Sequence, residues 1–131
     1  MGVLSRLFGT EHGDIAHDRV LRRYRHVLGT APIESLEQAH TEAFLDLREP
    51  QREAIYEELS RGAGTGERPL SSEPATLARS ATRAERRVPG SLERTLRSAD
   101  ERGGFGGSLV VPVVDHVVGS PLVSAFLPWN G

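Results

Sequence analysis

The sequence contains no cysteine and no lysine, although it has 131 residues and 16 basic side chains, all of them arginine. Without cysteine the chain cannot form a disulfide, a thiol nucleophile or a cysteine-ligated metal centre. Without lysine it cannot form a Walker A phosphate loop, a Schiff base or the lysine-dependent site of a kinase. The Gly-x-Ser-x-Gly motif of serine hydrolases is also absent. The sequence therefore favours a protein that is not an enzyme, and we expect no cofactor.

Aromatic residues are scarce at 5%, and the formal net charge is only −2. A chain of this length has room for one domain, whose core must be built mostly from aliphatic side chains. The small net charge provides no overall positive field, which disfavours nucleic acid as a partner. The stretch from Pro32 to Arg61 has three arginines and eight acidic residues, whereas residues 14–28 are rich in arginine. We expect these opposite charges to pair within the molecule.

Hydrophobic residues recur at helical spacing in five segments: 14–28, 33–47, 50–62, 72–88 and a short one from residue 91. Gly29 is the expected C-terminal stop of the first helix, and Ser91 the expected N-terminal cap of the last. The links are short, apart from a Gly-rich loop at 62–72. This pattern predicts a mainly α protein, a small antiparallel bundle of four to five short helices. We expect an N-terminal tail (1–13), a helical domain (14–102) and an apolar C-terminal segment (103–131).

The C-terminal segment has an apolar tract from Leu109 to Leu127 that fits either helices or strands. Gly119-Ser120-Pro121 interrupts the tract, and each half is too short to span a bilayer. Three interpretations remain: a helical or irregular hairpin packed on the helices, an interface for another chain, or a segment in a membrane surface. The candidate interaction residues are Leu109, Val110, Val113, Val114, Val117, Val118, Leu122, Phe126 and Trp129.

Two histidines, His17 and His40, fall on the apolar faces of neighbouring predicted helices. Each follows a carboxylate by three residues, Asp14 and Glu37 respectively. Carboxylate-x-x-His is half of the ligand set of di-metal helical bundles, so these four residues are candidate metal ligands. The further inward carboxylates that such a site needs are missing from the other apolar stripes. The sequence therefore favours neutral, buried histidines that are hydrogen-bonded to a carboxylate, to Tyr24 or to the backbone.

Several motifs resemble a group of small uncharacterised bacterial proteins from G+C-rich genomes. They are RRYRHVLGTAP, SLEQAHTEAF, PQREAIYEEL and LARSATRAERRVPGSLER. Members of that group are often labelled "cation-transporting ATPase" and have a similar Gly-rich apolar C-terminus. The chemistry contradicts this label here, because a P-type pump needs an Asp-Lys-Thr-Gly motif and many membrane spans. The resemblance implies no activity.

The leading functional hypothesis is a small helical adaptor or accessory subunit that acts through protein contacts and docks through its apolar C-terminus. It implies a protein partner or a second copy of the chain. The second hypothesis is a peripheral membrane protein anchored by residues 105–129. The third is a metal-binding helical bundle that uses the four candidate ligands. The first nine residues do not form a secretory signal, so we expect the protein to be cytoplasmic, with membrane association at the inner face under the second hypothesis.

Overall fold

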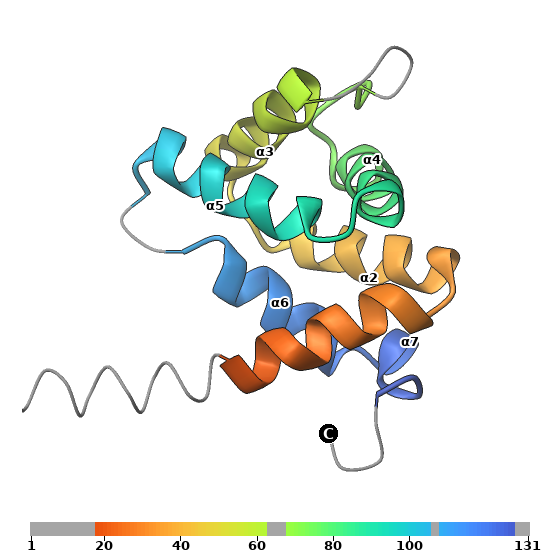
Figure 1. Cartoon of the computed structure of the whole chain (residues 1–131). Coiled ribbons are helices and arrows are strands. Elements are labelled where there is room, and N and C mark those ends of the chain that lie inside the picture. The colour runs from red at the N-terminus through yellow and green to blue at the C-terminus, as the bar shows by residue number, and fades with distance from the viewer. Residues whose placement is uncertain (1–17, 63–67, 106–107, 128–131) are drawn as a thin grey trace, which may run out of the picture.

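The computed structural model describes residues 18–62, 68–105 and 108–127, which form seven helices packed as a bundle and no strands (Figure 1). The N-terminal helix is described from residue 18 to residue 30. The others are α2 (Ile33–Leu45), α3 (Glu49–Gly62), α4 (Pro74–Arg87), α5 (Ser91–Gly103), α6 (Val110–Gly119) and α7 (Pro121–Ser124). The prediction of a helical bundle is confirmed. Five of the helices lie before residue 104, as predicted, and the apolar C-terminal segment forms the other two, so it is helical and not irregular.

Helix α2 lies at the centre and packs against α4, α6 and α7, while α3 packs against α4 and α5 (Figure 1). Among α2 to α7 the most extensive contact is between α2 and α4, and both helices bury small side chains. Ala39 of α2 and Ala78 of α4 are completely buried. Small residues at a helix contact let two helix backbones approach closely.

The apolar tract belongs to the core. Val110, Val113, Val114 and Val117 of α6 are at most 1% exposed and join the same cluster of buried side chains as α2. Of the three interpretations of the tract, packing on the other helices is the one that the described residues support. The predicted interruption is confirmed, since Ser120 caps α7 through its hydroxyl, which accepts from the amide of Leu122. No described helix is both long and apolar enough to cross a bilayer.

Two predicted helix ends differ from the observed ones by one residue, and at both a side chain from outside the helix satisfies the end. The N-terminal helix continues past Gly29, and Arg86 of α4 donates to the carbonyl oxygens of Leu28 and Ala31. Ser91 is the first residue of α5 rather than its cap, and its hydroxyl has no hydrogen-bond partner in the described part of the chain.

The cap of α5 is the carboxylate of Glu85, which accepts from the amides of Gly90 and Leu92. Gly90 has a φ of 93°, a conformation that favours glycine. This turn fixes where α5 begins relative to α4, and these two helices form opposite walls of the pocket described below.

Candidate anion-binding pocket

His40 is a buried structural histidine. Its ring is completely buried; the Tyr24 hydroxyl lies 2.8 Å from Nε2, and the Leu36 carbonyl oxygen 2.7 Å from Nδ1. Since a carbonyl can only accept, Nδ1 carries the proton and the Tyr24 hydroxyl donates to Nε2. Burial lowers the pKa of His40 from 6.5 to about 4, because a charged ring would lose its hydration. The prediction of a neutral, hydrogen-bonded histidine is confirmed at this position.

The candidate metal ligands do not form a metal site in the described part of the chain. Both ring nitrogens of His40 are engaged, which leaves no lone pair for a metal ion. The carboxylate of Glu37 lies 3.8 Å from Nε of Arg83. Asp14 and His17 fall outside the described residues. Among those that are described, no three His, Asp or Glu side chains are grouped so that they could hold a metal.

The candidate interaction residues of the C-terminus are mostly covered. Five of them are at most 1% exposed: Leu109, Val110, Val113, Val114 and Val117. Val118 and Leu122 are half-buried against the core, Phe126 is 37% exposed, and Trp129 lies outside the described residues. The expectation that this tract presents its apolar face is wrong for the five buried residues, because α6 packs that face against α2, α5 and α7. Docking through them would require α6 to leave the core.

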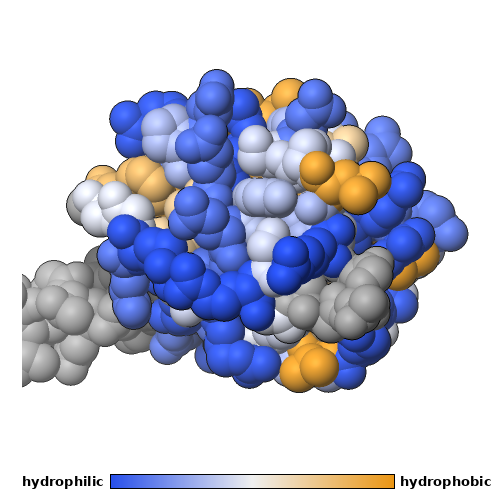
Figure 2. Space-filling model, turned by 90° about the horizontal axis from the view of Figure 1, so that it is seen from above, coloured by the Kyte–Doolittle hydropathy of each residue, from blue (hydrophilic) through white to orange (hydrophobic). Residues whose placement is uncertain are grey.

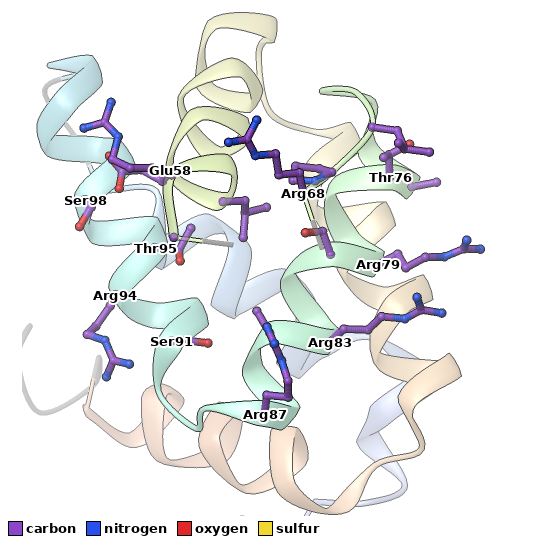
Figure 3. A pocket seen from close by; sticks show the side chains of 18 residues that line it. Glu58, Arg68, Thr76, Arg79, Arg83, Arg87, Ser91, Arg94, Thr95 and Ser98 are labelled. Carbon is purple, nitrogen blue, oxygen red and sulfur yellow. The ribbon is translucent and has the colours of Figure 1, made fainter. Parts of the chain in front are cut away.

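A pocket of about 990 Å³ lies between the C-terminal end of α3, the segment 68–70, α4 and the first part of α5 (Figure 3). Its lining is unusual in charge, because six arginines and one acidic residue contribute to it. The arginines are Arg61, Arg68, Arg79, Arg83, Arg87 and Arg94, and the acid is Glu58. A chain with a net charge of −2 thus gathers positive charge around one cavity.

The charges around the pocket are only partly compensated within the described residues. Oε1 of Glu58, the one acid of the lining, lies 2.6 Å from Nε of Arg102, which is not part of the lining. Arg83 faces Glu37, and Arg87 makes an interaction of its own. The remaining four arginines (61, 68, 79 and 94) form no ion pair with any described carboxylate. They create a positive potential that an anion would neutralise.

Hydroxyl groups complete the polar part of the lining, contributed by Thr76, Ser80, Ser91, Thr95 and Ser98. The Ser91 oxygen is buried and has no hydrogen-bond partner in the described part of the chain. In Figure 3 Arg68 and Arg87 extend over the hollow between α4 and α5, the Ser91 hydroxyl points towards it, and Arg79 and Arg83 project from the outer side of α4. The pocket thus combines cationic side chains with hydroxyl groups.

The exposed apolar side chains of the described residues are scattered. Figure 2 views the molecule from above, and this face is mostly hydrophilic with small separate apolar patches. In the described part of the chain five large hydrophobic side chains are exposed: Leu45, Leu70, Val88, Val111 and Phe126. They come from different segments of the chain, and scattered exposed apolar residues are ordinary for a folded protein.

Reasoning from the sequence missed this pocket, although one signal was present. Arg79, Arg83 and Arg87 recur every four residues, which places them on one side of a helix. The sequence could not tell that α5 and the end of α3 lie beside α4, or that Arg87 extends over the hollow while Arg79 and Arg83 project from the outer side of the helix (Figure 3).

Comparison with known proteins adds no relative, because no family model, no curated protein and no solved structure matches this chain.

Proposed function

We propose that this protein binds a phosphorylated small molecule in the pocket between α3, α4 and α5. The observation that supports the proposal is the lining itself, to which six arginines and a single acid contribute, with Arg68 and Arg87 extending over the hollow (Figure 3). The planar guanidinium group presents paired N–H donors that match two phosphate oxygens, and it stays charged at every physiological pH. The ligand's charge would offset the repulsion between these arginines.

The size of the pocket suits a small ligand. A volume of about 990 Å³ is near the upper end of the range of roughly 300–1,000 Å³ that is usual for small-molecule sites. The hydroxyl groups of the lining can donate to or accept from a bound molecule, which adds directional contacts to the attraction between charges. A binding role also agrees with the expectation that the protein is not an enzyme.

The test is isothermal titration calorimetry with inorganic pyrophosphate as the probe and the full-length chain. The variants are Arg68→Ala and Arg94→Ala, which come from opposite sides of the pocket. We expect each to weaken binding about tenfold, the equivalent of one charge-assisted hydrogen bond of about 1.5 kcal/mol. Added salt should weaken binding by the wild type.

The matched control is Arg22→Ala, which removes the same charge from an exposed position on the N-terminal helix, outside the pocket lining. Circular dichroism checks that all three variants remain folded; we expect this because Arg22, Arg68 and Arg94 are exposed. Absence of binding to the wild type at low salt would contradict the proposal. So would an equal loss of affinity in Arg22→Ala, because binding would then follow net charge and not the pocket.

A further inference from the structure

We propose that the outer side of the N-terminal helix docks on a membrane surface that contains anionic lipid. The proposal goes beyond the pocket, because no described residue of this helix is part of the pocket lining. It also differs from the hypothesis of a C-terminal anchor, because Val113 and Val117 are buried in the core. It rests on the arginines of the helix, on the few ion pairs that they form, and on the apolar residues that precede the helix in the sequence.

The outer side of the N-terminal helix is basic. It carries Arg19, Arg22, Arg23 and Arg25, of which Arg23 is half-buried and the others are exposed, and Asp18 is the one acid among residues 18–30. The core-facing side is apolar and includes the buried residues Leu21, Tyr24, Val27 and Leu28. The helix lies at the outside of the bundle (Figure 1). Its 13 described residues therefore present a basic surface about 20 Å long.

Ion pairs within the molecule neutralise little of this charge. Among the four arginines only Arg25 forms an ion pair with a described carboxylate, that of Glu93 on α5, at 3.0 Å. Arg97 of α5 lies 2.8 Å from the same carboxylate, so two arginines share one negative charge. No ion pair joins this helix to the acidic stretch 32–61 in the described part of the chain, contrary to the expectation from the sequence. The surface thus has positive charge left for a partner.

The sequence around this surface favours lipid among the anionic partners. Charge alone binds a membrane weakly, and stable attachment needs a second, apolar signal. Just before the described helix, residues 3–8 contain four large apolar side chains: Val3, Leu4, Leu7 and Phe8. An acidic protein surface would use the arginines alone. For nucleic acid the helix offers no stacking platform, because Tyr24, the one aromatic among residues 18–30, is completely buried.

The test is co-sedimentation of the full-length chain with two kinds of vesicle, phosphatidylcholine alone and phosphatidylcholine mixed with phosphatidylglycerol. We expect binding to the mixed vesicles at low salt, a loss of this binding as salt is added, and no binding to the neutral vesicles. The double variant Arg19→Gln and Arg22→Gln should bind the mixed vesicles about 25-fold more weakly, because each arginine near an anionic surface contributes about fivefold.

The matched control is the double variant Arg61→Gln and Arg79→Gln, which removes the same charge from exposed positions on α3 and α4 and should bind as the wild type does. Circular dichroism checks that both double variants are folded. An equal loss in the control would overturn the proposal, because binding would then follow net charge or the pocket.

A third double variant, Leu7→Ser and Phe8→Ser, tests the choice of lipid. It should also bind the mixed vesicles more weakly, and an unchanged affinity would overturn that choice, because the arginines would then act without an apolar signal. Absence of wild-type binding to the mixed vesicles would overturn the whole proposal. The pocket's affinity for pyrophosphate is a separate measurement that none of these results changes.

Discussion

Acid should destabilise this protein through His40 before most of its carboxylates are protonated. The folded chain holds the ring neutral, with a pKa of about 4, whereas the same ring in the unfolded chain has its ordinary value of 6.5. Below pH 6.5 the unfolded state takes up a proton that the folded state does not. The free energy of unfolding therefore falls as the pH drops from about 6.5 to about 4, and His40 imposes no such penalty above this window.

The size of the effect follows from the two pKa values. Their difference corresponds to about 3 kcal/mol, at about 1.4 kcal/mol for each pKa unit. That is a large part of the 5–15 kcal/mol by which a domain of this kind is usually stable. Glu93 acts in the same direction but at lower pH, because its hydrogen bonds to Arg25 and Arg97 hold its pKa below the ordinary 4.5.

The assay is urea unfolding followed by circular dichroism at several pH values between about 4 and about 7. In His40→Gln the slope of stability against pH should be shallower than in the wild type by up to about 1.4 kcal/mol per pH unit in this window. His26→Gln is the control, because His26 is exposed and its replacement should leave the slope unchanged. Parallel slopes for the wild type and His40→Gln would refute the reasoning. If His40→Gln does not fold, an NMR titration of His40 in the wild type decides, and a pKa near 6.5 would refute it equally.

Three further predictions concern the fold and are checked by urea unfolding. Tyr24→Phe should cost about 1–3 kcal/mol because it leaves Nε2 of His40 buried without a donor, and an equal loss in Tyr56→Phe would contradict this. Glu85→Ala should cost about 2 kcal/mol because it removes the cap of α5, and an unchanged midpoint would contradict that role. Val113→Ala should cost about 1–3 kcal/mol and the exposed Val111→Ala much less; similar costs would contradict the burial of α6.

The helices could be predicted from the sequence because their periodicity is a local property. The predicted starts of α2 and α3 lie within one residue of those observed, at Ile33 and Glu49. The helix ends near Gly29 and Ser91 were each missed by one residue. Arg86, which donates to the Leu28 carbonyl, comes from far along the chain, whereas Glu85 lies only five residues before Gly90 and its capping role went unnoticed in the sequence. Burial of the apolar tract was one of three interpretations, because a hydrophobic face has the same sequence whether it meets its own core or a partner.

The candidate site was harder to predict than the fold. The polarity of His40 on an apolar face pointed to a buried, hydrogen-bonded ring, and the structure confirms this. The pocket depends on residues from α3, α4 and α5 that lie as far apart in the sequence as Arg61 and Arg94. The charge pattern of α4 alone could equally describe a solvated helix face, so no local rule distinguished a pocket wall from an ordinary surface.

The most direct test of the central claim is an NMR titration of the isotope-labelled full-length chain with pyrophosphate, read at every assigned backbone amide. We predict saturable shifts for residues that line the pocket on α4 and α5, among them Thr76, Ser91 and Thr95, and little change around Arg22 on the N-terminal helix. Shifts centred on the N-terminal helix, or shifts that grow without saturating across all exposed arginines, would contradict a binding site between α3, α4 and α5.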